Sequence, residues 1–344
     1  MDTQGFDPSG TIERNVALEL VRVTEAAALN AAPFMGQGRK EDSDKAAVDA
    51  MRSALSGVDI RGVVVIGEGD KDHAPKLFYG EQVGRGFDAE SPHLHEYPML
   101  DIAVDPIDGT TLLSKGMPGS IAVIAAAERG KMFAPPEKVY YMEKIAVGAS
   151  ARDVIDIEAP AYVNLERIAA VNHCPVSDIV VTILDRPRHA QLIKDVREAG
   201  ARIRLISDGD VIGAIQAVME EYNVDVYMGI GGAPEAVLAA AAIKCLGGDI
   251  QTRIVAKDEE NLQILKDLNI DMQKVYHVQD LVAGNDVSFA ATGITTGDML
   301  RGVEPIGNGK MRTNSIMMRA RSGTIRNITA IHRYARKHIA KTEG

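Results

Sequence analysis

Short apolar runs alternate with amphipathic segments between residues 179 and 246, and this alternation restricts the possible folds more than any other feature of the chain. The runs predict strands and the amphipathic segments predict helices, in the order 179–184, 190–199, 202–206, 211–221, 224–228 and 234–246. Repeated strand–helix units with short turns are typical of parallel strands joined by right-handed crossovers. We therefore expect a mostly parallel sheet, covered by helices, in the second half of the chain.

The first half has a different pattern, in which strands outnumber helices. Helices are expected at about 11–33 and 48–55, and strands at 62–67, 101–105, 120–126 and 140–147. Because few helices are available to connect these strands in parallel, a mixed sheet is expected. The two patterns, with a domain size of roughly 150 residues, predict an α/β (α+β) protein with two domains, residues 1–160 and 161–344.

Three further segments complete this outline. Residues 84–98 are polar and flanked by proline, which favours a loop, and residues 287–292 predict one more strand. The basic C-terminal segment, residues 310–341, is expected to form a strand and a final helix with a solvated face.

The charge and the residue usage exclude several classes of partner. The chain has 38 Lys and Arg against 48 Asp and Glu, a net charge of −10, and such an acidic surface repels nucleic acid. The longest apolar stretches are far shorter than the roughly 20 residues that span a bilayer. Two cysteines, Cys174 and Cys245, are too few for a disulfide framework, and the N-terminus lacks a signal-peptide pattern. We expect a cytoplasmic protein with no nucleic-acid or membrane partner.

Acidic residues follow two of the predicted strands in the first half. Glu68 and Asp72 follow the strand at 62–67, Asp105 ends the strand at 101–105, and Asp108 comes three residues later. One acid at a strand end is usually a loop residue or a helix cap, but two such ends in one sheet bring carboxylates together. Carboxylates at close range repel each other unless a cation lies among them. Mg²⁺ and Mn²⁺ prefer oxygen ligands, and the chain has no His and Cys set typical of zinc.

The residues after Asp108 add a possible anion site. Gly109, Thr110 and Thr111 would begin a turn or helix with unpaired N–H groups and hydroxyls, which is where anions bind. Acids for a metal, followed directly by amides for a phosphate, are the arrangement needed for metal-assisted hydrolysis of a phosphate ester.

Polar residues also follow the strands of the second half. Arg186 and Arg188 follow the first strand, Asp208 and Asp210 follow the second, and Glu235 lies just after the third. Ligands of α/β folds bind at the carboxyl ends of such strands, and arginine suits bidentate contacts with phosphate. Taken singly, each residue has an ordinary alternative: a solvated loop for the arginines, a helix cap for Asp210 and a favourable helix dipole for Glu235.

The chain resembles the class II fructose-1,6-bisphosphatases of bacteria, within the lithium-sensitive sugar and inositol phosphatase superfamily. The resemblance extends from about Thr11 to Arg336. It is carried, in chain order, by the motifs GRKEDSD, VIGEGDKDHAP, DPIDGTT, YYMEKIAVG, LDRPRHAQLI, RLISDGDV, GIGGAPEAVLAAA and ATGITTGDML. It implies a layered α-β-α-β-α fold and hydrolysis of the 1-phosphate of fructose 1,6-bisphosphate with Mg²⁺ or Mn²⁺. A homodimer or homotetramer is also implied.

The resemblance assigns roles to residues of this chain. The implied metal ligands are Asp44, Glu68, Asp105, Asp108 and Glu235, and the implied catalytic residues are Lys40, Asp72 and Thr110. The implied substrate-binding residues are Asp108, Gly109, Thr110, Tyr141, Arg186, Pro187, Arg188, Asp208, Gly209, Asp210 and Gly232. Many members of the family have Glu where this chain has Asp108, and the shorter side chain would alter the metal preference.

Three alternatives stay open at this point. The substrate could be sedoheptulose 1,7-bisphosphate, alone or as well, or an inositol phosphate, and a panel of esters would distinguish these. The GIGG segment could be a dinucleotide loop of an oxidoreductase, although it lacks the third spaced glycine of that motif. The chain could also be a sugar-phosphate sensor without turnover.

Overall fold

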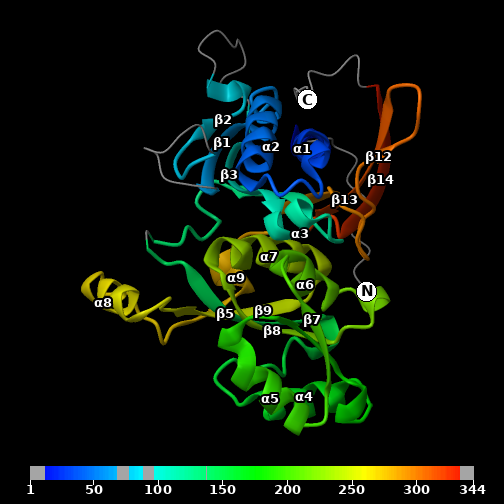
Figure 1. Ribbon diagram of the computed structural model, residues 1–344. Helices are drawn as coiled ribbons and strands as arrows, with labels where there is room; N and C mark the ends of the chain where they lie inside the picture. The colour runs from blue at the N-terminus through cyan, green and yellow to red at the C-terminus, as the bar shows by residue number, and fades with distance from the viewer. Residues whose placement is uncertain (1–11, 68–76, 88–96, 137, 334–344) are drawn as a thin grey trace, which may run out of the picture.

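The computed structural model describes residues 12–67, 77–87, 97–136 and 138–333. Within these residues the chain forms two β-sheets, one of eight strands and one of six, with helices outside and between them (Figure 1). None of the helices in these ranges is long and apolar enough to cross a membrane.

The first sheet has the order β12-β13-β11-β4-β3-β1-β2, with β14 paired to β13. Its strands are β1 (Arg61–Ile66), β2 (Gln82–Val83), β3 (Met99–Asp108), β4 (Ile121–Glu128), β11 (Ser288–Gly293), β12 (Glu304–Pro305), β13 (Lys310–Arg319) and β14 (Thr324–Arg333). The β1–β3 pair is parallel and the other pairs are antiparallel. A mixed sheet was expected for the first half of the chain, and this sheet is mixed.

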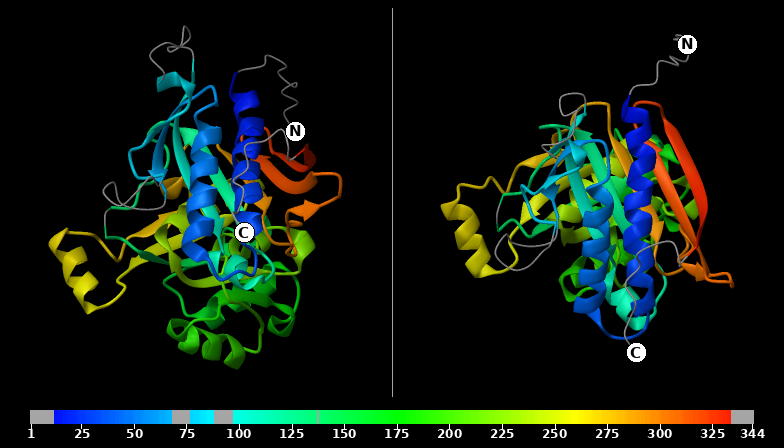
Figure 2. Two further views of the ribbon diagram at one scale, coloured as in Figure 1. Left: turned by 45° about the horizontal axis from the view of Figure 1, so that its top comes forward. Right: turned by 90° about the horizontal axis from the view of Figure 1, so that it is seen from above.

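Helices α1 (Ile12–Ala31) and α2 (Lys40–Leu55) lie side by side on one face of the first sheet (Figure 2). Their apolar residues pack with β3, β4 and β11 into one of the hydrophobic cores. The second helix begins at Lys40, earlier than expected, because the polar segment before Val48 belongs to its first two turns. Glu41 and Asp42 lie in the first turn, where negative charge favours the helix dipole.

The second sheet has the order β10-β9-β5-β8-β6-β7. Its strands are β5 (Tyr141–Val147), β6 (Val180–Leu184), β7 (Arg202–Ile206), β8 (Val226–Gly232), β9 (Asp249–Val255) and β10 (Val275–His277). The expectation of a mostly parallel sheet is wrong, because only β7, β6 and β8 are parallel neighbours. Strand β5 lies between β8 and β9 and runs antiparallel to both, and β10 is antiparallel to β9.

Helices cover both faces of the second sheet. They are α4 (Ala161–Val171) and α5 (Ala190–Glu198) on the outer face, and α6 (Asp210–Gln216) and α7 (Ala233–Leu246) on the face toward the first sheet. Helix α7 contacts strands of both sheets. Its sequence is apolar on all sides, which is typical of a helix buried all round. The remaining α-helices of the described residues are α3 (Thr110–Lys115), α8 (Glu259–Asp267) and α9 (Val278–Leu281).

The two sheets exchange strands along the sequence. Strand β5 precedes residue 160 but joins the second sheet, whereas β11 to β14 come after residue 280 and join the first sheet. The division into domains 1–160 and 161–344 stays a prediction. The C-terminal segment forms the antiparallel pair of β13 and β14 as far as Arg333, so residues 324–333 are a strand and not a helix. The larger part of the loop expected at 84–98 falls outside the described residues.

Candidate functional site

A cavity of about 350 Å³ lies at the carboxyl ends of β3, β6, β7 and β8, beside the first residue of β5. It is lined by polar groups from both sheets. The lining residues are Asp105, Ile107, Asp108, Gly109, Thr110, Thr111, Tyr141, Leu184, Arg186, Arg188, Asp208, Gly209, Asp210, Gly231, Gly232 and Glu235. Because most of these groups lie at or just after the carboxyl end of a strand, the folding of the two sheets brings them together.

The junction between β3 and α3 forms one wall of the cavity. Gly109 has φ +84°, a left-handed conformation that glycine adopts without strain, and it turns the chain directly from the strand into the helix. The Thr110 hydroxyl lies 3.2 Å from the Ile107 carbonyl and 3.4 Å from Asp44 Oδ1 of α2. Lys40 Nζ donates to Thr111 Oγ1 at 3.0 Å. The start of α2 therefore lies against this wall, and Lys40 and Asp44 reach the site through the two threonines.

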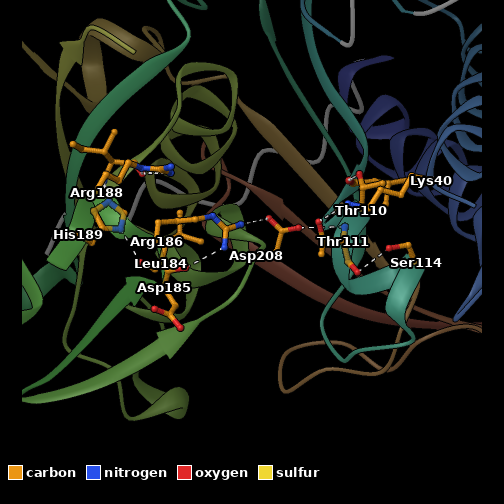
Figure 3. A network of polar contacts seen from close by, with 12 residues as sticks. Lys40, Thr110, Thr111, Ser114, Leu184, Asp185, Arg186, Arg188, His189 and Asp208 are labelled. Carbon is orange, nitrogen blue, oxygen red and sulfur yellow. Dashed lines mark hydrogen bonds and ion pairs between the residues drawn. The ribbon is translucent and has the colours of Figure 1, made fainter. Parts of the chain in front are cut away.

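The opposite wall carries two arginines. Arg188 donates from Nε and Nη2 to the Ile230 carbonyl at 3.0 and 2.8 Å, and its guanidinium lies 5.0 Å from the centre of the Tyr141 ring. Arg186 Nη2 lies 3.5 Å from Asp208 Oδ1. Asp208 Oδ2 accepts a hydrogen bond from the Thr111 amide at 3.3 Å, so a line of contacts joins the two walls (Figure 3). Pro187 begins the 3₁₀ turn between the arginines and does not line the cavity.

His189 forms hydrogen bonds with the ends of two of these strands, β6 and β8, and it was not among the site residues predicted from the sequence. Its Nδ1 lies 2.7 Å from the Leu184 carbonyl and its Nε2 accepts the Ile230 amide at 2.7 Å. Since Nε2 is an acceptor, the ring is neutral and Nδ1 carries the proton. Burial is the main cause that lowers the pKa of His189, which favours the same neutral form. The only signal in the sequence was its place in the DRPRH motif.

Asp108 and Glu235 each have one fully buried carboxylate oxygen in the cavity. Asp108 Oδ2 and Glu235 Oε2 are inaccessible to solvent and have no hydrogen-bond partner among the described residues. Burial, and then the charge of Asp210, raises the pKa of both side chains. A buried carboxylate oxygen without a partner is costly unless a cation or proton occupies the space beside it. These two residues therefore suit an oxygen-liganded divalent cation.

The structure gives less detail for the other predicted metal ligands and for Asp72, which was predicted as a catalytic residue. Asp105 lines the cavity, and its Oδ1 accepts the Ile107 amide at 3.0 Å. Glu68 and Asp72 lie outside the described residues. Within the described residues alone, no group of three or more His, Cys, Asp or Glu side chains is arranged to hold a metal ion.

Asp210, a predicted substrate-binding residue, has a partner that was not identified from the sequence, Lys144. Lys144 Nζ of β5 donates to Asp210 Oδ2 at 2.6 Å, and both side chains are buried. Asp210 lines the cavity, whereas Lys144 does not. A lysine within a strand sequence gives no sign that it is buried, so the pattern could not reveal this pair.

A family model and several named relatives match nearly the whole chain. A family model described as bacterial fructose-1,6-bisphosphatase, glpX-encoded, matches residues 14–332. The D-fructose 1,6-bisphosphatase class 2/sedoheptulose 1,7-bisphosphatase of Trichodesmium erythraeum is 41% identical over 335 residues, which cover 93% of this chain and 96% of that protein. The protein of the same name from Synechococcus elongatus is 40% identical over 339 residues, 94% of this chain and 97% of that one. A solved structure, an extragenic suppressor from Pyrococcus furiosus, aligns over 59% of this chain and 69% of its own at 14% identity, with a TM-score of 0.29.

Proposed function

The chain belongs to the family of bacterial fructose-1,6-bisphosphatases, and on that premise we propose that the cavity of about 350 Å³ is its active site. The enzyme is a phosphatase that hydrolyses fructose 1,6-bisphosphate. It releases the 1-phosphate and leaves fructose 6-phosphate. The observation that carries the location of the site is the lining of this one cavity by five acids and two arginines from the strand ends of both sheets.

The wall of the cavity that carries Arg186 and Arg188, here called the arginine wall, binds the phosphate that is not cleaved. Arg186 and Arg188 present planar guanidinium groups, whose N–H donors match phosphate oxygens. The contacts of Arg188 with the Ile230 carbonyl and the Tyr141 ring hold its guanidinium in place before the substrate arrives. Asp208 and Asp210 accept hydroxyl groups of the sugar. Gly209 and Gly232 let the backbone approach the substrate closely.

The wall formed by the junction between β3 and α3, here called the threonine wall, binds the phosphate that is cleaved. Gly109 and Thr110 offer backbone and hydroxyl donors at the start of α3. The Thr110 hydroxyl, 3.4 Å from Asp44, orients the attacking water together with Asp72. Lys40, which reaches Thr111, stabilises negative charge on the phosphate oxygens.

Divalent cation chemistry fits the residues of this cavity. The residues that would hold Mg²⁺ or Mn²⁺ are Asp44, Glu68, Asp105, Asp108 and Glu235. The unpartnered oxygens of Asp108 and Glu235 support this assignment, because a cation would remove the cost of burying them. A bound divalent cation neutralises phosphate oxygens and lowers the pKa of a water molecule. The Asp at position 108, where many relatives have Glu, is proposed to alter the choice between the two metals.

A second substrate is favoured by the names of the relatives. The relatives from Trichodesmium erythraeum and Synechococcus elongatus are both named for sedoheptulose 1,7-bisphosphate as well as fructose 1,6-bisphosphate. The two sugars share a phosphate at each end, so the arginine wall suits either. An inositol monophosphate would leave that wall without a ligand. The dinucleotide interpretation of the GIGG segment is not favoured, because Glu235 Oε2 lies where a side chain at Gly232 would be and puts an acid at the proposed pyrophosphate position.

Further features of the protein follow from the family and are part of the proposal. We propose a layered α-β-α-β-α fold, supported by the contacts of α7 with both sheets. The relation to the lithium-sensitive phosphatase superfamily rests on the DPIDGT motif. A cytoplasmic location and a homodimer or homotetramer are proposed as well.

The function is tested by phosphate release from a panel of esters. Purified protein is assayed with Mg²⁺ and with Mn²⁺ on fructose 1,6-bisphosphate, sedoheptulose 1,7-bisphosphate, fructose 6-phosphate and inositol 1-phosphate. We expect both bisphosphates to be cleaved with the highest kcat/KM, and a chelator to abolish turnover. If neither bisphosphate is cleaved with either metal, the proposed function is wrong. A monophosphate cleaved as well as the bisphosphates would contradict the role of the arginine wall.

A further inference from the structure

Lys144 lies at a position where the strand pattern would otherwise require an apolar side chain. On β5, Met142, Lys144 and Ala146 share the face toward α6 and α7, and the first and last of these belong to the hydrophobic core there. Lys144 is only 2% exposed. Its neighbours across the sheet are Gly229 on β8 and Thr252 on β9. Burying an ammonium group in such surroundings costs several kcal/mol unless it is paired, so packing alone does not explain it.

The partner of Lys144 is an acid of the active-site cavity. The Nζ–Oδ2 distance to Asp210 is 2.6 Å, and the Asp210 side chain is 7% exposed. The space for this pair is made by Gly231 on β8, because a Cβ atom there would collide with Asp210 Oδ2 and would lie 2.9 Å from Lys144 Nζ. This close contact explains why position 231 of the GIGG segment is glycine: Gly231 leaves room for the buried ammonium group of Lys144 directly behind Asp210.

This pairing divides the buried acids of the cavity into two kinds. Asp108 Oδ2 and Glu235 Oε2 have no hydrogen-bond partner in the part of the chain that the structure describes, and they suit a divalent cation. Asp210 has a cation supplied by the protein itself. Its oxygen bonded to Lys144 is therefore not available to coordinate a metal, although Asp210 lies close enough to both other acids to perturb them electrostatically.

We propose that Lys144 is a positioning residue that reserves Asp210 for a hydroxyl group of the substrate and keeps it out of the metal site. The proposal rests on the proposed function, because it takes Asp210 to be a substrate-binding residue. Lys144 acts in two ways. It holds one Asp210 oxygen at a fixed position behind the cavity, and it compensates a negative charge that would otherwise add to the charge facing the metal.

The test is a double-mutant cycle on the full-length enzyme. The variants are Lys144→Met, Asp210→Asn and the double variant, in which both charges are removed together and neither is left buried alone. Lys244→Met is the matched control, because Lys244 of α7 is also partly buried and donates to Gln279 and to the Val282 carbonyl, outside the cavity. Circular dichroism establishes that each variant is folded. The measured quantities are kcat and KM for fructose 1,6-bisphosphate at saturating Mn²⁺, and the Kd for Mn²⁺ without substrate.

Lys144→Met is expected to raise KM about tenfold while kcat falls by less than about threefold. Its effect should vanish in the Asp210→Asn background, because Lys144 acts only through Asp210. Without substrate, Lys144→Met should bind Mn²⁺ about three to ten times more tightly, since the uncompensated Asp210 adds negative charge. The double variant should return the Kd for Mn²⁺ to about the wild-type value. Lys244→Met should leave all three quantities near those of the wild type.

Additive losses in the cycle would overturn the proposal, because they would mean that Lys144 stabilises the fold independently of Asp210. An unchanged Kd for Mn²⁺ in Lys144→Met would overturn the charge-compensating role. If Lys144→Met does not fold, the comparison of the double variant with Asp210→Asn decides: equal KM values support the proposal and a further rise contradicts it. The Mn²⁺ measurement does not depend on turnover. A wild-type protein without bisphosphatase activity would therefore refute the proposed function and still leave the metal prediction to be judged.

Discussion

Replacing His189 tests whether the backbone between two strand ends determines the position of Arg188. The imidazole contacts the Leu184 carbonyl and the Ile230 amide, each at 2.7 Å, and it is fully buried. In His189→Ala both backbone groups lose their partner, at a cost of about 1–3 kcal/mol each. We therefore expect the free energy of unfolding to fall by about 2–5 kcal/mol, measured by urea denaturation. His173→Asn is the control, because His173 has φ +53° and asparagine tolerates that conformation.

Two further variants test the two hydrogen bonds of His189 one at a time. An asparagine amide lies near the position of Nδ1 and can replace the contact with Leu184, whereas a glutamine amide lies near the position of Nε2 and can replace the contact with Ile230. The Ile230 carbonyl accepts both hydrogen bonds from Arg188. His189→Asn should therefore raise KM for the bisphosphate about tenfold and His189→Gln much less. Equal KM values for the two variants, or a loss of under about 1 kcal/mol in His189→Ala, would refute the reasoning.

Three other predictions follow from the same geometry. Burial lowers the pKa of His189. Its neutral form therefore contributes fully to stability above about pH 6.5, its ordinary pKa, and this contribution is lost as the pH falls below that value. Between pH 7.5 and 5.5, the urea concentration at the unfolding midpoint should fall more for the wild type than for His189→Gln. Gly232→Ala would put a Cβ atom onto Glu235 Oε2, so Mn²⁺ binding should weaken by at least about tenfold in calorimetry, and unchanged binding would exclude Glu235 as a ligand. Thr110→Ala should lower kcat by about 10²–10⁴ without a large change in thermal stability, and retained turnover would mean that another group orients the water.

The elements between residues 179 and 246 could be predicted from local patterns, because apolar runs of strand length alternate there with segments of helix length. The strand expected at 202–206 is β7, and the helix expected at 234–246 is α7 (Ala233–Leu246). The arrangement of the sheets could not be predicted in the same way. The partners of β5 on β8 lie 79 to 91 residues further along the chain, and the alternation of apolar residues in β5 is compatible with pairing in either sheet. Sheet membership is a property of long-range packing, which a local pattern does not contain.

The site could be anticipated to the extent that it follows strand ends. Arg186, Asp208 and Glu235 each follow a predicted strand, and the structure brings all three to one cavity. Lys144 and His189 were missed for a common reason. Each is polar and buried, and the significance of each depends on a contact with a residue at least 40 positions away in the sequence. A local sequence pattern does not contain such contacts.

The charges of the cavity lead to a last prediction, on how the substrate binds. Of the five lining acids, Asp210 is paired with Lys144 and Asp208 with Arg186. Arg188 is the other lining arginine, and Asp105, Asp108 and Glu235 are the remaining lining acids. Even with Asp108 and Glu235 protonated, as their raised pKa values favour, the cavity has no net positive charge for a sugar with two phosphates of about −1.5 to −2 each.

Binding of the substrate, and not only its hydrolysis, should therefore require the divalent cation. The measurement is calorimetric titration of the slow variant Thr110→Ala with fructose 1,6-bisphosphate, with Mg²⁺ and with a chelator. We expect the affinity to fall by at least about 100-fold in the chelator, which corresponds to about 2.7 kcal/mol. Arg188→Lys, tested with Mg²⁺ present, keeps the charge and removes the bidentate geometry. Its loss in affinity therefore measures how much of the binding depends on the guanidinium geometry and not on the charge. Equal affinity with and without the cation would mean that the arginines suffice and that the acids do not repel the substrate.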